Sequence, residues 1–283
     1  MKRARDEGAR AVTEPPRPAV DPREIDHDAP RDPAARDACA KFFLNNLPEP
    51  DAPPECAPPP EETKAFAKSE LATRGDSHGL EHAETVRALA LAIWDDGAGE
   101  FEATKALAEE TGFDATKVVE TAALLHDVCD HKYVDDATAA GREAVARRDA
   151  FLANALPEAE AAAVLAIVAA VSYSREAKAL KKGVPPAWET LDEPARTLRH
   201  VVSDADKIDA IGVRGLGRCA AYARERGVKG AVNVVAEVAA HCDEKLLKLR
   251  GEFVRTERGR ELAKAGHFWL RTWRCEAKRA GLG

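Results

Sequence analysis

Several features that would assign the chain to a particular class are absent. Its longest apolar run, 161–171, has 11 residues, fewer than the roughly 18 that a membrane-spanning helix needs. The opening residues MKRARDEGAR contain no hydrophobic segment of a secretory signal, and their acidic residues are not typical of an organelle transit peptide. The formal charge of −7 disfavours a broad basic surface for nucleic acid. We therefore expect a cytoplasmic protein with no membrane segment.

Common cofactor and disulfide patterns are missing as well. The six cysteines form no Cys-x-x-Cys pair and show no even spacing, which favours a reduced, intracellular protein. There is no P-loop, no His-Glu-x-x-His and no Gly-x-Ser-x-Gly. Gly212, Gly215 and Gly217 follow no strand pattern, so a dinucleotide fingerprint is excluded. No alternating run or Asn-Gly hairpin signal indicates a β-sheet.

Proline is concentrated at one end of the chain. Residues 1–62 contain 13 of the 17 prolines and have a net charge of −5, and their only aromatic residues are Phe42 and Phe43. Such a segment buries too little apolar surface to offset its ordering entropy, so we expect a disordered acidic tail. Within it, 35–47 has the pattern of a helical turn or two, either docked on the remaining chain or available to a partner.

The remaining residues, 63–283, have a net charge of −2 and a helical pattern. In 82–94, for example, apolar residues recur at i, i+3, i+4 and i+7. The apolar segment 158–171, which begins after Pro157, is expected to be central. The sequence thus predicts one all-α domain behind the tail. The expected helices are 62–73, 82–94, 117–127, 138–155, 158–171, 192–210, 214–225, 230–249 and 257–279.

Histidine and aspartate gather in three groups within these helices. The groups are DSHGLEHAETV (76–86), AALLHDVCDHKY (122–133) and VVSDADKIDAIG (201–212). Imidazole and carboxylate groups in otherwise apolar helices are costly to bury unless they are paired or bind a metal. Two imidazoles and two carboxylates form a suitable ligand set for a divalent transition metal. A single histidine would be weak support, but three groups together favour a metal site.

The order His…His-Asp…Asp on helices resembles the HD-domain metal-dependent phosphohydrolase superfamily. The resemblance is closest to the stand-alone bacterial and plant-type HD hydrolases, whose motifs look like HGLEHAETV (78–86), AALLHDVCDHK (122–132) and DADKIDAIGVRGLGR (204–218). A further segment, HCDEKLLKL (241–249), is similar too. The resemblance covers most of residues 70–270 and implies a single HD-type helical domain over 63–283.

The resemblance implies a metal site at four positions. Asp204 is the alternative to the last of them, because two positions along a helix point to different sides. This sequence departs from the family at Gly79, where Asp is common, and at Thr85, where Arg is common; both departures leave the metal ligands intact. The implied ligands are His82, His126, Asp127 and Asp206.

Other roles follow from the chemistry of such a site. A metal-bound water near an acidic group loses its proton readily, and Asp130 is the first choice for that group. Lys132 is the candidate for stabilising phosphate charge. The competing interpretation for Asp130 and Lys132 is a local ion pair. For Arg214 and Arg218 it is a solvated helix face. The candidate substrate-binding residues are His78, Asp204, Arg214 and Arg218, and Lys245 and Lys248 are weighed in the same way.

The resemblance therefore implies an enzyme with one divalent ion: Mn, Co, Ni, Fe, Zn or Mg. It would cleave a phosphate ester or pyrophosphate bond of a small phosphorylated metabolite, most plausibly a nucleotide, with water activated by the metal. The alternative is a catalytically silent, nucleotide-binding regulatory protein with a structural metal. Cyclic-nucleotide phosphodiesterase activity fits less well, because no second histidine pair is present for a second metal. We expect no nucleic-acid or membrane partner, and self-association is possible.

Overall fold

The computed structural model describes residues 32–74, 78–97, 99–130 and 134–283, and this part of the chain is helical throughout, with no β-strand. The prediction of an all-α fold is confirmed. The α-helices are α1 Pro33–Asn45, α2 Glu61–Leu71, α3 Leu80–Asp96, α4 Glu102–Thr111, α5 Ala115–Leu125, α6 Ala139–Ala155, α7 Glu158–Ala170, α8 Tyr173–Lys181, α9 Ala195–Asp209, α10 Val213–Glu225, α11 Ala231–His241 and α12 Glu257–Arg279. A 3₁₀ turn, η2 Ala187–Thr190, and two π-helical segments, η3 Cys242–Leu246 and η4 Leu249–Phe253, complete the set.

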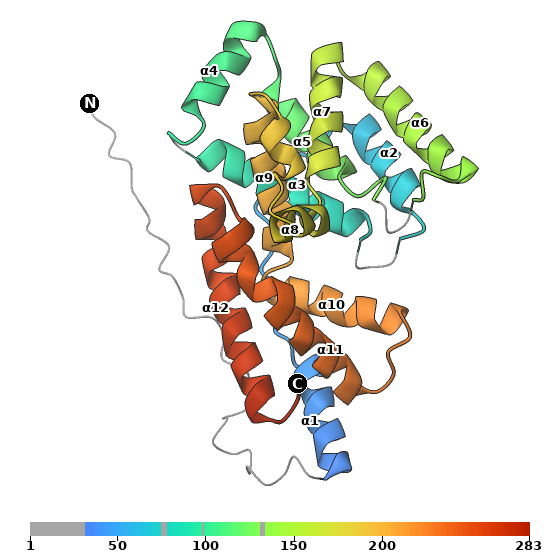
Figure 1. Ribbon diagram of the computed structural model, residues 1–283, viewed down its shortest axis with the longest axis vertical. Coiled ribbons are helices and arrows are strands. Elements are labelled where there is room, and N and C mark those ends of the chain that lie inside the picture. Colours follow the sequence, from blue (N-terminus) through green and yellow to red (C-terminus); the bar gives the residue numbers. More distant parts are fainter. Residues whose placement is uncertain (1–31, 75–77, 98, 131–133) are drawn as a thin grey trace.

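Helices α3, α5, α7 and α9 pack on one another and form the core of the upper group of helices (Figure 1). Their facing side chains are almost all aliphatic and fully buried, such as Val86, Leu124, Ile167 and Val201. Burial of this kind contributes about 25 cal/mol for each Å² of apolar surface removed from water. The central place expected for 158–171 is confirmed, since α7 contacts both α5 and α9.

A second group of helices, α1, α10, α11 and α12, lies beneath the first (Figure 1). After α11 the helix changes from α to π winding at η3 and again at η4, before an extended residue, Val254, turns the chain into α12. Helix α9 contacts α12 and η4 and so connects the two groups.

The part of the chain between residues 32 and 60 differs from the expected tail, because it packs on the second group and on α3. Helix α1 contacts α11, Ala40 is fully buried, and the ring of Phe43 meets that of Trp273 edge to face at 6.0 Å. Further along, the Arg87 guanidinium donates to the Ala57 carbonyl. The short helix expected at 35–47 therefore forms and docks on the remaining chain.

A buried ion cluster holds α8 against α9. Glu176 of α8 accepts from Arg199 at 3.0 Å and from Lys207 at 3.2 Å, both on α9, and from Arg255 at 2.8 Å. The indole of Trp188 also donates to Glu176, at 3.1 Å. Since Arg199 and Lys207 are almost fully buried, the Glu176 carboxylate supplies the charge that makes their burial tolerable.

All six cysteines are free. Among the described helices, none combines the length and the apolar character that crossing a membrane requires.

Candidate metal centre and cavity

The three histidine and aspartate groups come together where α3, α5 and α9 meet. His82 lies in the first turn of α3, and Asp206 lies in the last turn of α9. Helix α5 ends at Leu125, and the turn that follows it presents His126 and Asp127. Buried apolar residues anchor each of the three helices in the core, so the polar residues emerge at one common edge.

Four side chains, His82, His126, Asp127 and Asp206, converge there and are called the His/Asp cluster below. The Nε2 atoms of His82 and His126 are 3.2 Å apart. Asp206 Oδ1 lies 3.5 Å from the His82 Nε2 and 3.8 Å from the His126 Nε2. Asp127 places Oδ2 3.6 Å from the His82 Nε2 and Oδ1 3.6 Å from the His126 Nε2. The sequence assigned these four residues to one site, and the structure brings them together.

The hydrogen bonds on the far side of each ring orient the two histidines. His126 Nδ1 lies 2.8 Å from the Ala123 carbonyl, which can only accept, so this nitrogen donates. His82 Nδ1 lies 2.8 Å from a carboxylate oxygen of Asp209 and donates to it in the same way. In the neutral rings, both Nε2 lone pairs then face the centre of the cluster, an arrangement typical of histidines that bind metal.

Burial and charge move the pKa values of the cluster in opposite directions. Burial lowers the pKa of His82 well below its ordinary value, and the positive charges of Arg218 and His126 add to this effect. Burial also acts to lower the pKa of His126, but Asp127 and Asp206 outweigh it, so that pKa is raised. Burial raises the pKa of Asp206, yet the neighbouring cations outweigh it and the net change is a lowering. Asp206 is thus an anion at neutral pH, suited to a cation at the centre of the cluster.

Asp209 fixes His82 from behind the cluster. Its carboxylate is almost fully buried and pairs with the Arg218 guanidinium as well as with His82. Arg214 lies 3.4 Å from the other Asp209 oxygen and also contacts Glu81. The sequence analysis included Asp209 in the third group but gave it no role. It could have been found from its place on α9, three residues after Asp206 and so near it on the helix surface.

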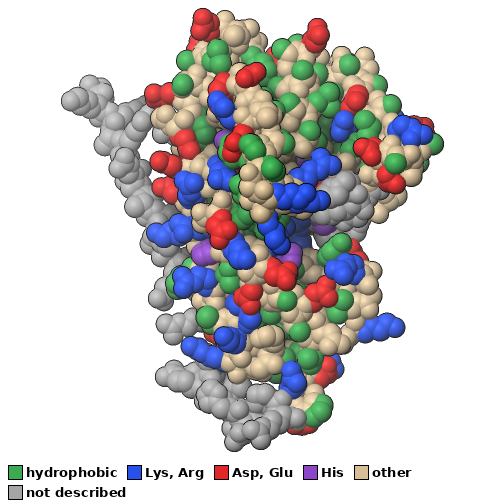
Figure 2. Space-filling model, viewed as in Figure 1, with side chains coloured by type: hydrophobic (Ala, Val, Ile, Leu, Met, Phe, Trp, Pro, Cys, Tyr) green, Lys and Arg blue, Asp and Glu red, His purple; other side chains and the backbone are tan. Residues whose placement is uncertain are grey.

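A cavity of about 930 Å³ opens beside the His/Asp cluster and is called the cavity below. Its wall combines residues of the α5–α6 connection, α6, α7, α8, α9, α10, α11, η3 and η4. Figure 2 shows Lys and Arg side chains gathered across the middle of the molecule, where the two groups of helices meet, with histidines among them. Besides the cluster, the charged residues of the wall are the basic Arg148, Arg175, Lys207, Arg218, Arg226 and Lys245 and the acidic Asp130, Asp135, Asp136, Glu237 and Glu244.

The other predicted residues differ in their relation to the cavity. His78, Asp130 and Arg218 line it, and the ring of His78 lies 6.1 Å from that of His82. Arg214 instead lines a smaller pocket of about 300 Å³ behind His82, formed partly by Leu47. Lys132 lies outside the described residues.

The structure does not bring Asp204 to the cavity. This residue is fully buried, and its carboxylate accepts from the backbone N–H groups of Arg255 and Thr256 and from the Thr256 hydroxyl. It therefore holds the first turn of α12 rather than a substrate. Asp206, two residues on, points into the cluster, at the place that the sequence preferred for it.

The two departures from the family pattern lie beside the cluster. Gly79 is the residue before α3, and Thr85 is buried, with its hydroxyl donating to the Glu81 carbonyl within the helix. The buried Thr85 hydroxyl therefore has its hydrogen-bond partner within α3. Neither position supplies a charge to the cavity.

Sequence reasoning missed several residues of the cavity wall. Tyr173, Arg175, Tyr222 and His241 all line it, although they come from α8, α10 and α11. The ring of Tyr222 meets that of His78 at 6.0 Å. No local pattern could have assigned them, because only packing of distant helices brings them to one wall.

Comparison with known proteins gives relatives of the same fold. No protein-family model matches the sequence. The curated YpgQ of Bacillus subtilis, described as uncharacterized, is 28% identical over 210 residues, which are 74% of this chain and 87% of YpgQ. A crystal structure of YpgQ matches at 26% identity with a TM-score of 0.51, over 77% of this chain and 94% of that one.

Two further solved structures share this fold. YpgQ in complex with ADP matches with a TM-score of 0.50 at 24% identity, over 77% of this chain and 93% of that one. A Lactobacillus plantarum protein matches with a TM-score of 0.52 at 21% identity, over 77% of this chain and 94% of that one. The chain therefore has the fold of YpgQ, and its three histidine and aspartate motifs meet at one point on that fold.

Proposed function

We propose that this protein is a metal-dependent phosphohydrolase that acts on a small phosphorylated metabolite, most plausibly a nucleotide. The observation that supports this function most strongly is the convergence of the His/Asp cluster at the edge of a large cavity whose wall carries Lys and Arg side chains among acidic ones. A cluster of this composition suits a divalent cation, and the cations of the wall suit an anionic substrate.

The spacing of the cluster fits a single divalent ion. Two ligand atoms that each lie about 2.1 Å from one ion can be at most about 4.2 Å apart. The two ring nitrogens of the cluster are 3.2 Å apart, and the nitrogen–oxygen contacts range from 3.5 to 3.8 Å, within that limit. His82, His126 and Asp206 are thus placed to hold one ion together. When bound, a divalent ion would lower the pKa of a water molecule and neutralise charge on a phosphoryl group.

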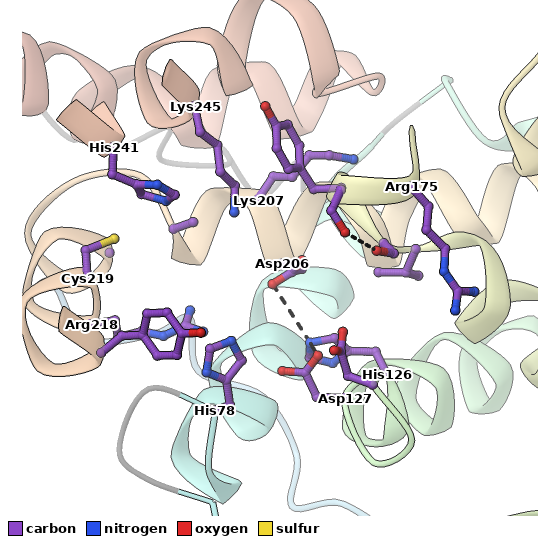
Figure 3. A pocket seen from close by; sticks show the side chains of 18 of the residues that line it. His78, His126, Asp127, Arg175, Asp206, Lys207, Arg218, Cys219, His241 and Lys245 are labelled. Atoms are coloured by element: carbon purple, nitrogen blue, oxygen red, sulfur yellow. Dashed lines mark hydrogen bonds and ion pairs between the residues drawn. The ribbon is translucent and has the colours of Figure 1, made fainter. Parts of the chain in front are cut away.

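The residues around the cluster have roles that suit this chemistry. Asp130 lines the cavity three residues after Asp127, and we assign it to accept the proton of the attacking water. Arg218 lies in the wall beside His78 (Figure 3), and we assign both to the phosphate groups of the substrate. Because Arg218 also pairs with Asp209, the residue that orients His82, substrate binding and the cluster are connected.

Three observations support a nucleotide as the substrate. A cavity of about 930 Å³ lies within the range usual for small-molecule sites, roughly 300–1,000 Å³. Its wall contains two tyrosine rings, Tyr173 and Tyr222, together with several cations, which suits a planar base joined to phosphates. YpgQ, which shares the fold, was crystallised with ADP.

A substrate panel tests the function. Protein loaded separately with Mn²⁺, Co²⁺, Ni²⁺ or Mg²⁺ is incubated with nucleoside mono-, di- and triphosphates, and the products are separated by chromatography. We expect metal-dependent release of phosphate or pyrophosphate, abolished when His126→Ala is combined with Asp127→Ala. Retained activity in that double variant would refute the mechanism. Nucleotide binding without turnover across the whole panel would instead favour the catalytically silent regulatory protein.

A further inference from the structure

Lys245 extends into the cavity from η3, across from the His/Asp cluster. Figure 3 shows its side chain pointing from η3 into the cavity, toward the end of α9 that presents Asp206. Lys245 lies within the π-helical segment Cys242–Leu246, and π turns occur frequently at functional sites. Its neighbours Cys242 and Leu246 are fully buried, so the backbone of this turn is anchored in the core. The turn thus presents one lysine at a fixed place in the cavity wall.

The ring of Tyr173 guides the Lys245 side chain. The Lys245 Nζ lies 4.7 Å from the centroid of the Tyr173 ring, a distance at which the negative face of the ring attracts a cation. Tyr173 is the first residue of α8, and its ring packs on that of Phe253 in η4 at 4.8 Å. Because the tyrosine is held by a second ring, it restricts the conformations of the long lysine side chain and reduces the entropy lost when the ammonium binds an anion.

Lys248 on the same stretch of chain provides a comparison. It is exposed, lies between η3 and η4, and is not part of the cavity wall. The two lysines have the same charge and lie three residues apart, but only Lys245 faces the cavity. If Lys245 acts in the cavity, replacing it will weaken ligand binding and replacing Lys248 will not. A general effect of positive charge would weaken binding equally in both variants.

We propose that Lys245, guided by Tyr173, binds a phosphate group of the substrate from the side of the cavity opposite the His/Asp cluster. This inference rests on the proposed function, because it assumes that the ligand of the cavity is a phosphorylated compound. The ammonium supplies three N–H donors to phosphate oxygens. The phosphate is thereby held between a cation on η3 and the cluster on α3, α5 and α9.

The test measures binding rather than turnover. Protein loaded with Mn²⁺ is titrated calorimetrically with inorganic pyrophosphate and with an ADP analogue whose phosphates are joined by a methylene group. We expect Lys245→Met to weaken both affinities about tenfold, as for the loss of one charge-assisted hydrogen bond. Lys248→Met should leave them unchanged, and Lys245→Arg should restore most of the loss. The Mn²⁺ affinity and the melting temperature of all three variants should match the wild type.

Two variants of Tyr173 test the guiding role. Tyr173→Phe keeps the ring and should bind both probes as the wild type does, whereas Tyr173→Leu should weaken binding several-fold. Equal affinities in the wild type and Lys245→Met, or no binding of either probe by the wild type, would overturn the role of Lys245. Equal affinities in the wild type and Tyr173→Leu would overturn the role of Tyr173. Because no turnover is needed, a protein that binds both probes but hydrolyses nothing refutes the proposed function and leaves this inference standing.

Discussion

At the scale of single residues, Asp204 and Asp209 show how two aspartates on one helix take different tasks. Asp209 is bound to His82 and Arg218, and Asp204 is bound to the backbone that begins α12. Both are buried, so burial alone would not distinguish them. Only the partner of each carboxylate shows which one supports the His/Asp cluster.

This difference predicts two distinct effects of replacing aspartate by asparagine. Asp209→Asn removes the anion that orients His82, and we expect a ten- to hundredfold loss of metal affinity, which is typical for partners of metal-binding histidines. Asp204→Asn should lower the free energy of unfolding by about 1–3 kcal/mol and leave metal affinity unchanged. Metal titration and urea unfolding of both variants check this. A similar metal affinity in Asp209→Asn and the wild type would show that Asp209 does not orient the ligand.

Residue identity is also the scale at which the sequence was most informative. His82, His126 and Asp127 could be assigned because they match the HD-type motifs position by position, and His126 and Asp127 also follow an apolar helical run, a local signal. Asp206 was preferred to Asp204 only through the family resemblance, because the rotation of α9 against α12, on which the choice depends, is not visible in the sequence. Tyr173 and Lys245 remained without a definite role because they meet the cluster only after α8 and η3 have packed.

At the scale of secondary-structure elements, α8 depends on Glu176 for its attachment. Burial raises the pKa of Glu176, but the cations around it outweigh burial and bring that pKa from its ordinary 4.5 to about 2. A carboxyl whose pKa is lower in the folded state stabilises the fold above its unfolded pKa. That contribution is lost as the pH falls from about 4.5 through about 2, and amounts to about 3 kcal/mol.

Glu176→Gln should therefore destabilise the protein by about 3–5 kcal/mol at pH 7, because buried cations lose their partner. The difference from the wild type should narrow as the pH falls toward 2. Urea unfolding followed by circular dichroism between pH 7 and pH 2.5 measures this. The control is Glu193→Gln, whose ion pair with Arg196 is exposed and should contribute less than about 1 kcal/mol. A difference that does not change with pH would contradict the lowered pKa.

The docking of α1 gives a second prediction at this scale. Phe43 is half-buried against Trp273, so Phe43→Ala should lower the free energy of unfolding by about 2 kcal/mol. Phe268→Ala is the matched control, because Phe268 is 57% exposed and should change it by less than about 0.5 kcal/mol. Thermal unfolding monitored by tryptophan fluorescence distinguishes them. Equal stability of the two variants would mean that α1 adds nothing to the fold.

The elements that sequence reasoning overlooked share one property. Helices α4 and α8 have sequences, EATKALAEET and YSREAKALK, with few large apolar residues, so periodicity gave no signal for them. By contrast, 257–279 was predicted with the bounds of α12, whose first turn Thr256 caps by accepting from the Gly259 N–H. The tail was expected to extend to residue 62, but the chain already packs on the fold from α1 onward. Local composition does not reveal this, because it does not show that Phe43 docks on Trp273.

At the scale of the whole molecule, the His/Asp cluster joins three helices that are distant in sequence. A ligand that binds only the folded state stabilises it by mass action, by about 2.7 kcal/mol at a hundred times its dissociation constant. Removing the metal with a chelator should therefore lower the melting temperature of the wild type by several degrees. The double variant His126→Ala, Asp127→Ala should show no such change. Equal shifts in both proteins would mean that the metal binds elsewhere.

The metal content of the protein tests the central claim most directly. Wild type, Asp206→Ala and Asp204→Ala are dialysed against Mn²⁺, passed through a desalting column and analysed by atomic emission. The account predicts one Mn²⁺ for each chain of the wild type and of Asp204→Ala, and much less than one for Asp206→Ala. Equal metal in the wild type and Asp206→Ala, or loss in Asp204→Ala alone, would contradict it.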